Sequence, residues 1–183
     1  MLDDKLILVT GGTGSFGKAF TQMVLSRYEP RKLIVFSRDK VIASFGVLEH
    51  LFSPRDFLRG CANILSPGGL LVLTCPNAKG FDVMTLGPVS DTVDAEHLNY
   101  FHPASLAHLL GECGFSTLEA FTLGKLDAEL VRKKAVAGEF DLSDQPFLRH
   151  VLIDEWERAG AAFQRFLVDN QLSSHMWIVA EKR

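Results

Sequence analysis

Short apolar runs alternate with longer amphipathic stretches along this chain, which is the pattern of an α/β protein. The apolar runs predict β-strands, because β-branched and aromatic residues fill them and turn-forming residues bound them. The predicted strands are Lys5–Thr10, Lys32–Ser37, Val41–Phe45, Leu70–Cys75, Ser116–Thr122 and Ser174–Glu181. Strands that alternate with helices favour a mostly parallel sheet with helices packed on its faces.

The clearest predicted unit is a strand, a helix and a strand within residues 41–75. Ser53 suits the N-cap of the helix, Pro54 suits its first position, and Asp56 completes a capping-box-like pair. A Ser-Pro-Gly-Gly turn ends the helix before the second strand begins. Such a unit places its two strands parallel, with a right-handed crossover.

Further helices are predicted at Pro103–Cys113, Gly124–Gly138 and about Pro146–Asn170. The last helix keeps Phe147, Trp156 and Phe166 near a helical period, which gives it one apolar side. A helical insertion over about residues 124–172 suits a cover over a bound acceptor, a homodimer contact through the helix at 146–170, or a plain core helix. The pattern alone leaves these alternatives open.

A glycine-rich stretch follows the first predicted strand and precedes a plausible helix at Lys18–Arg27. Its glycines allow a tight turn and let the backbone approach a pyrophosphate at the helix N-terminus. The position between a strand and a helix indicates nucleotide binding more strongly than the glycines alone.

Residues 1–40 contain TGGTGSFGKAF followed by KLIVFSRDK, and they resemble the N-terminus of an extended short-chain dehydrogenase. The resemblance is to the UDP-N-acetylglucosamine 4,6-dehydratase type, and it implies an NADP-binding head. The cofactor-binding candidates are Thr10, Gly11, Gly12, Gly14, Ser15, Phe16, Gly17, Ser37, Arg38 and Asp39. The Tyr-x-x-x-Lys letters at Tyr28 and Lys32 begin before the second strand, are interrupted by Pro30 and lie far from where the family places this pair, so no dehydratase chemistry is expected.

Residues 41–183 contain VLEHL, ILSPGGLLVLTCPN and EHLNYFHPASL in that order. They are similar to the C-terminal part of a class I S-adenosylmethionine (SAM) dependent methyltransferase of the small-molecule kind. The resemblance implies a Rossmann-like sheet with an antiparallel last strand, SAM as cofactor, and methyl transfer to a small molecule. A sugar or nucleotide-sugar acceptor is favoured by the dehydratase-like head.

The two resemblances meet near Lys40 and Val41, which suggests a fusion within a single Rossmann-like domain that is incomplete relative to either family. Parallel neighbouring strands need a crossover of about a dozen residues, and only residues 38–40 separate the predicted strands here. These strands are therefore expected to merge into one bent strand, to form a tight hairpin, or to leave one segment unpaired. The methyltransferase's own glycine loop is absent, so SAM binding and activity are expected to be impaired unless Gly11–Gly17 substitutes.

Glu49 and His50 follow a predicted strand at its carboxyl end, where open α/β sheets bind ligands. The resemblance implies that this pair orients the methyl acceptor or binds a divalent metal, while the structural alternative is a cap on the following turn. The additional upstream glutamate of such metal sites aligns with Gly46, so no metal site is predicted.

His97 lies in a loop that the resemblance places over the acceptor pocket. An imidazole near a methyl-accepting hydroxyl suits a general base, because its pKa lies close to working pH. The structural alternative is a loop pinned by packing of its aromatic residues.

Composition and charge bear on whether the protein binds nucleic acid, spans a membrane or lies in the cytoplasm. A net charge of −3 and the lack of a basic run give no reason to expect nucleic acid. The start, Met-Leu-Asp-Asp-Lys, does not resemble a signal peptide, and no apolar run approaches the length of a membrane span, so a cytoplasmic protein is expected. Cys61 and Cys75 fit buried free thiols. Three functions stay open: a SAM-dependent methyltransferase, an NADP-binding fragment of a nucleotide-sugar dehydratase, and a non-catalytic fusion product.

Overall fold

The computed structural model describes residues 6–10, 20–24, 26, 32–36 and 41–183. The chain falls into two compact units. We call Met1–Cys75, Pro103–Ala120 and Trp177–Arg183 the sheet unit, and Pro76–His102 with Phe121–Met176 the helical unit. The predicted joint near residue 40 lies outside the described residues.

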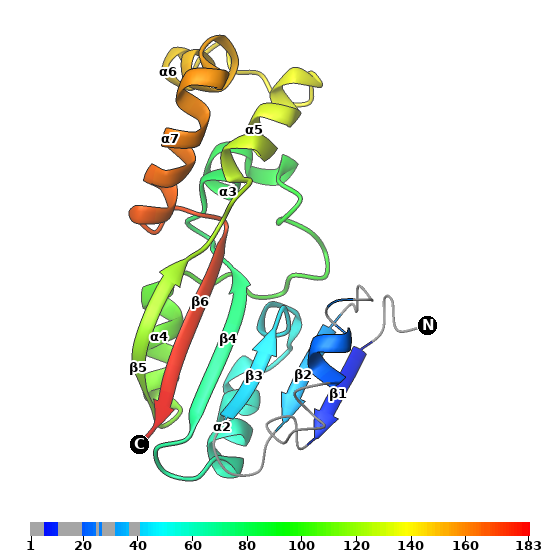
Figure 1. The fold of residues 1–183 in the computed structure, drawn as a ribbon, viewed down its shortest axis with the longest axis vertical. Coiled ribbons are helices and arrows are strands. Elements are labelled where there is room, and N and C mark those ends of the chain that lie inside the picture. The colour runs from blue at the N-terminus through cyan, green and yellow to red at the C-terminus, as the bar shows by residue number, and fades with distance from the viewer. Residues whose placement is uncertain (1–5, 11–19, 25, 27–31, 37–40) are drawn as a thin grey trace. The chain divides into compact units, whose positions relative to one another are not determined.

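The described strands form one mixed sheet in the order β1-β2-β3-β4-β6-β5 (Figure 1). The strands are β1 (Leu6–Thr10), β2 (Lys32–Phe36), β3 (Val41–Phe45), β4 (Leu70–Pro76), β5 (Phe115–Thr122) and β6 (His175–Lys182). Every strand predicted from the apolar runs is therefore present within one or two residues of its expected bounds. The fold is Rossmann-like, as expected.

The last strand, β6, runs against its neighbours β4 and β5. Lys182 near its end donates its backbone N–H to Gly69 (2.8 Å) and accepts from Gly68 (3.0 Å), just before β4 begins. Arg183 donates in the same way to Gly114 (3.0 Å), just before β5 begins. The end of β6 thus meets the starts of both neighbours, which confirms the predicted antiparallel last strand.

The strands on either side of residues 37–40 form an antiparallel pair. Phe36 pairs with Ile42, and Ile34 pairs with Ser44, so β2 and β3 run in opposite directions. This is the hairpin among the alternatives that the short connection allowed. β1 is parallel to β2, and β3 is parallel to β4, as expected for the strand–helix–strand unit.

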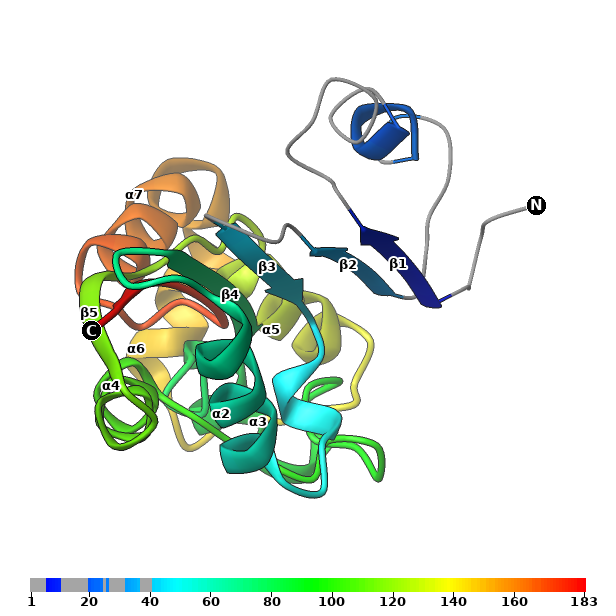
Figure 2. The same ribbon diagram turned by 90° about the horizontal axis from the view of Figure 1, so that it is seen from below.

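Helix α2 (Pro54–Ile64) begins where the capping pattern predicted. The Ser53 side chain accepts a hydrogen bond from the Asp56 backbone N–H (3.4 Å) and donates one to the Asp56 carboxylate (2.7 Å). α2 buries Leu58 and Cys61. α4 (Pro103–Glu112) lies on the same face of the sheet (Figure 2).

The helical unit contains α3 (Phe81–Leu86), the short helix η2 (Gly87–Val89), α5 (Asp127–Val136), α6 (Pro146–Arg149), the π-helical turn η3 (His150–Asp154) and α7 (Trp156–Asp169). Its apolar core joins buried residues of these helices and of the adjoining loop. They are Leu86, Ala128, Val131, Leu142, Val151, Leu152 and Leu167. The sequence pattern gave no sign of α3.

The prediction of one continuous helix over residues 146–170 is wrong. The Glu155 backbone N–H donates to the carbonyl of His150 (2.9 Å), a wider turn than an α-helix makes, and Glu155 leaves helical geometry at φ −119° and ψ 23°. This turn contains one residue more than an α-helical turn, and the additional residue shifts the apolar stripe of the helix. Because of that shift, Val151 before the break and Leu167 after it are buried in one core.

Candidate functional site

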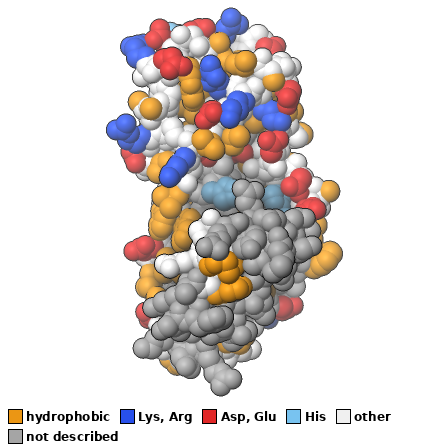
Figure 3. All heavy atoms as spheres, turned by 45° about the vertical axis from the view of Figure 1, so that its right-hand side comes forward, with side chains coloured by type: hydrophobic (Ala, Val, Ile, Leu, Met, Phe, Trp, Pro, Cys, Tyr) orange, Lys and Arg blue, Asp and Glu red, His pale blue; other side chains and the backbone are white. Residues whose placement is uncertain are grey.

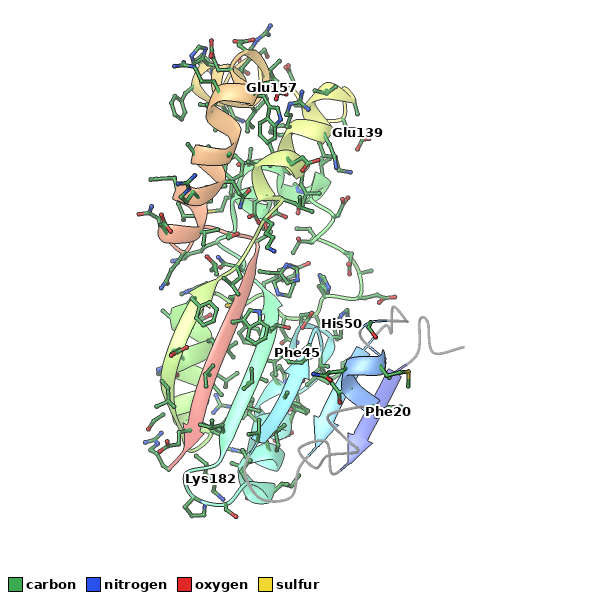
Figure 4. All side chains as sticks on the ribbon, viewed as in Figure 1. Phe20, Phe45, His50, Glu139, Glu157 and Lys182 are labelled. Carbon is green, nitrogen blue, oxygen red and sulfur yellow. The ribbon has the colours of Figure 1, made fainter. Side chains whose placement is uncertain are left out.

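Glu49 and His50 lie in the short helix η1 (Leu48–His50), directly after the carboxyl end of β3. Gly46 makes this turn possible with φ +60°, and its backbone N–H donates to the carbonyl of Thr74 in β4 (3.1 Å). Glu49 is buried, and its carboxylate lies 3.8 Å from Nε2 of the half-buried His50, which is labelled in Figure 4. The predicted pair therefore sits together at the ligand-binding end of β3.

The Cys75 thiol, which is close enough to Glu49 to be affected by its charge, is disfavoured from ionising. Burial raises the pKa of the Cys75 thiol, and the neighbouring Glu49 carboxylate raises it further. Burial likewise raises the pKa of Cys61 to about 12. Cys61, Cys75 and Cys113 are buried free thiols, as predicted for the first two. Neutral thiols of this kind are poor nucleophiles and poor metal ligands.

Most predicted cofactor-binding residues, namely Gly11, Gly12, Gly14–Gly17 and Ser37–Asp39, lie outside the described residues. The one described candidate, Thr10, ends β1. Thr10 pairs with Phe36, and Phe36 pairs with Ile42 at the start of β3. β1 therefore ends at the end of the sheet where β3 begins.

Glu49 and His50 follow the other end of β3. A single crevice that holds a nucleotide after Thr10 and an acceptor at Glu49 would need β1 and β3 to have their carboxyl ends at the same end of the sheet. The strand directions place the carboxyl end of β1 and the carboxyl end of β3 at opposite ends of the sheet (Figure 1). The described residues thus do not fit a single SAM crevice that uses both.

His97 lies in the helical unit, in the loop that follows η2, and its ring has a defined orientation. Its Nδ1 lies 2.6 Å from the carbonyl oxygen of Thr92 and 3.6 Å from the Asp94 carboxylate. The other Asp94 oxygen accepts from the backbone N–H groups of Glu96 (2.6 Å) and His97 (2.9 Å). The ring meets Tyr100 edge to face, with centroids 6.4 Å apart.

Sequence reasoning missed a network of buried polar residues in the helical unit. Asp82 and Asp127 are 3% and 2% exposed, and Ser174 connects them. The Ser174 hydroxyl donates to Asp82, and its backbone N–H donates to Asp127 (2.6 Å). The available signal was weak: each aspartate interrupts an apolar stretch, as in Phe81-Asp82-Val83.

Asp127 is held as a carboxylate. Burial raises its pKa, but donors from Ser173, Ser174 and Gln164 together outweigh burial, so its pKa is lowered. Both ends of the Gln164 amide are hydrogen-bonded. Its nitrogen donates to Asp127, and its oxygen accepts from the Ala128 backbone N–H (3.0 Å). Asp127 therefore ties the start of α5 to α7 and to the segment before β6.

Asn77, directly after β4, closes this network. Its side-chain amide donates to the carbonyls of Gln171 (3.1 Å) and Ser173 (2.9 Å), and its backbone N–H donates to Ser174 (2.7 Å). Close approach here requires Gly80, since a Cβ at that position would lie 2.7 Å from Ser174 Cα. Asn77 is fully buried, so its role in this network is structural.

The helical unit also has an open pocket of about 450 Å³ between α5 and α7. It is lined by Gly124, Lys125, Glu129, Trp156, Glu157, Gly160, Ala161, Gln164 and Arg165. Both charge signs line it, and Figure 3 shows acidic and basic side chains interspersed over the visible face of the unit. None of the residues predicted to be functional lines this pocket.

The family model described as methyltransferase domain matches residues 21–120, more than half of the chain. The chain belongs to the methyltransferase domain family. The match includes Glu49, His50 and His97, and it begins within the stretch that resembles a dehydratase. No helix in the described part of this methyltransferase-family chain is long and apolar enough to cross a bilayer.

A Mycolicibacterium smegmatis protein, named as a probable S-adenosylmethionine-dependent methyltransferase, is 34% identical over 95 residues, which is 48% of this chain and 35% of that protein. The UDP-N-acetylglucosamine 4,6-dehydratase (inverting) of Campylobacter jejuni is 54% identical over 41 residues, 22% of this chain and 12% of that enzyme. The chain thus spans little more than a third, or less, of the length of these relatives.

Among solved structures, phosphoethanolamine N-methyltransferase 2 of Haemonchus contortus, in complex with S-adenosyl-L-methionine, superposes with a TM-score of 0.48. The sequences are 13% identical, and the superposition covers 100% of this chain and 49% of that one.

Proposed function

We propose that this chain transfers a methyl group from SAM to a hydroxyl of a small molecule. The observation that carries the proposal is the methyltransferase family match over residues 21–120, which includes Glu49, His50 and His97. SAM would supply the methyl group. The chain's own residues would bind the acceptor, orient it and remove its proton.

His97 is the proposed general base. A carbonyl oxygen only accepts hydrogen bonds, so the 2.6 Å contact to Thr92 requires the proton on Nδ1 of the His97 ring. The neutral ring then carries its lone pair on Nε2, and this nitrogen takes the acceptor's hydroxyl proton as the new C–O bond forms.

Glu49 and His50 are the proposed acceptor-orienting pair. They follow β3 at its carboxyl end, and the Glu49 carboxylate lies beside the His50 ring. A pair of this kind can hold a sugar hydroxyl by accepting and donating hydrogen bonds. We propose a sugar or nucleotide-sugar as acceptor, supported by the short dehydratase-like match.

The dehydratase-like match supports a second candidate function, NADP binding without dehydratase chemistry. Its identity of 54% over 41 residues is higher than that of the methyltransferase relatives, although it is much shorter. The proposed cradle is Thr10–Gly17 with Ser37, Arg38 and Asp39. This candidate and methyl transfer concern opposite ends of the sheet, so they are separable.

Calorimetric titration of the full chain with SAM, S-adenosylhomocysteine and NADP tests these functions. Binding of SAM and its demethylated product supports the methyltransferase, and binding of NADP alone supports the second candidate. Binding of none supports a non-catalytic fusion product. His97→Gln is the matched control: it should leave cofactor binding unchanged, because the proposed base faces the acceptor.

We also propose a homodimer through the helices at residues 146–170. Phe147 and Phe166 are 66% and 51% exposed there, so they offer apolar surface for a contact with a second copy of the chain. Light scattering on the eluted chain should give twice the monomer mass of 20.3 kDa. A Phe147→Ser, Phe166→Ser double variant should elute as a monomer.

A further inference from the structure

The pocket between α5 and α7 has the size of a small-molecule site. Its volume of about 450 Å³ lies within the range of about 300–1,000 Å³ that ligand pockets occupy. All of its lining residues belong to the helical unit, and none of Glu49, His50 and His97 is among them. A ligand here would therefore occupy a site separate from the one proposed for methyl transfer.

Trp156 contributes a fixed aromatic ring to the pocket wall. The ring packs against the apolar core of the helical unit, and the Arg132 guanidinium lies over it, 5.1 Å from its centroid. The ring also lies against the backbone of α7, because a Cβ at Gly160 would come within 2.6 Å of its Cε3 atom. An aromatic wall held in this way offers apolar contact to a ligand ring at little cost in side-chain freedom.

The neutral polar groups of the pocket are already hydrogen-bonded within the helical unit. The Gln164 side-chain nitrogen donates to the carbonyl of Gly124 (3.0 Å) and to Asp127, which uses both of its protons. The Gln164 oxygen accepts from the Ala128 backbone N–H (3.0 Å). Polar recognition of a ligand therefore falls to the charged side chains of the lining.

Four charged side chains line the pocket, namely Lys125, Glu129, Glu157 and Arg165. Glu129 is neutralised by Lys133 on the next turn of α5, with 2.8 Å between their charged groups. Glu157, which is labelled in Figure 4, lies in the first turn of α7. Among the residues that the structure describes, no ion pair includes Lys125, Arg165 or Glu157. Two cations and one carboxylate are thus available to a ligand.

We propose that this pocket binds a phosphorylated sugar, either free or as the ribose phosphate of a nucleotide. A phosphate monoester carries a charge of about −1.5 to −2 at pH 7, which matches the two cations, Lys125 and Arg165. The Glu157 carboxylate only accepts hydrogen bonds, so it suits the hydroxyl groups of a sugar ring. Trp156 suits the apolar face of the same ring. An uncharged sugar would leave both cations unused, and inorganic phosphate would leave the aromatic wall unused.

The fluorescence of Trp156 tests the proposal in the full chain. The sequence contains two tryptophans, so Trp177→Phe leaves Trp156 as the single reporter. Titration with glucose 6-phosphate or uridine 5′-monophosphate should change its emission, and the tighter of the two shows whether a free sugar phosphate or a nucleotide fits. Glucose, uridine and inorganic phosphate should each bind at least about 10-fold more weakly, because each lacks the charge or the ring. If Trp177→Phe does not fold, calorimetry on the wild-type chain gives the same comparison.

Charge substitutions identify the groups that hold the phosphate. Lys125→Gln and Arg165→Gln should each weaken binding about 10-fold, as expected for the loss of one charge-assisted hydrogen bond. Arg158→Gln is the matched control. Arg158 is an exposed arginine of the same helix, it pairs with Glu155 (2.7 Å), and it does not line the pocket. Its substitution should leave the affinity unchanged.

Three results would overturn the proposal. Neither an emission change nor heat with either phosphorylated sugar would show that the pocket does not bind this class of ligand. Inorganic phosphate binding as tightly as the phosphorylated sugars would show that the ring contributes nothing. Equal weakening by Arg158→Gln and Arg165→Gln would indicate general charge attraction in place of a site. Binding should persist in His97→Gln, and a chain that binds a phosphorylated sugar but transfers no methyl group would contradict only the proposed function.

Discussion

The sheet unit and the helical unit are stabilised by different kinds of interior. In the sheet unit, alternate residues of β4 and β6, such as Leu71, Leu73 and Ile178, are buried apolar side chains. The helical unit has an apolar core as well, but the segments around it are joined by the carboxylates of Asp82 and Asp127. The periodicity of apolar residues in the sequence predicts the apolar interior of the sheet unit. It does not predict the buried carboxylates of the helical unit.

The largest loss of stability is expected from a substitution in the apolar interior of the sheet unit. Leu71→Ala should reduce the free energy of unfolding by about 2–5 kcal/mol, because it removes a fully buried side chain and leaves a cavity. Denaturant unfolding gives the magnitude, and hydrogen exchange by mass spectrometry shows where protection is lost. Loss confined to α5 and α7 would contradict the division into two interiors.

A smaller loss of stability is expected from a substitution in the buried polar network of the helical unit. Asp127→Asn places an amide donor opposite the donors of Ser173 and Gln164, and it should cost about 1–3 kcal/mol. Exchange protection should fall in α5 and α7. Asp141→Asn is the matched control, since this exposed aspartate also accepts from a serine, Ser143, and its substitution should change little.

Acid should weaken the helical unit through the same carboxylate. The lowered pKa of Asp127 means that its contribution is fully present above its unfolded pKa of about 4. The contribution is lost as pH falls from that value through the folded pKa. Unfolding curves between pH 6 and pH 3 should show this loss in wild type and less of it in Asp127→Asn. Equal pH dependence in both would contradict the assignment.

The smallest effect is expected at the exposed pair of Arg55 and Glu112, whose charged groups lie 2.7 Å apart on the sheet unit. Their hydrogen bond lowers the pKa of Glu112, but solvent screens an exposed pair strongly. Glu112→Gln should therefore leave the unfolding midpoint almost unchanged. A shift as large as that of Asp127→Asn would show that surface charge matters more here than the buried network.

Much of the sheet could be predicted because its strands are short apolar runs between turn residues. The capped start of α2 and the inserted antiparallel β6 followed the expected patterns. The short connection after β2 limited the geometry to a few alternatives, and the hairpin is one of them. These features depend on local sequence or on simple chain geometry.

The helical unit could not be predicted to the same extent. The break at Glu155 depends on how two helical segments share one core, which a periodic pattern does not reveal. The roles of Asp82 and Ser174 depend on contacts between residues 92 positions apart, and single aspartates and serines usually lie on the surface. His97 could be singled out as a candidate base, but the Thr92 carbonyl that orients it could not.

The central claim is methyl transfer to a small-molecule hydroxyl with His97 as base. It is tested most directly by incubating the full chain with SAM labelled in its methyl group and a panel of sugars and nucleotide-sugars. The account predicts a labelled product with wild type and a rate lower by about 10²-fold or more with His97→Gln. No labelled product, or the same rate with His97→Gln, would contradict it.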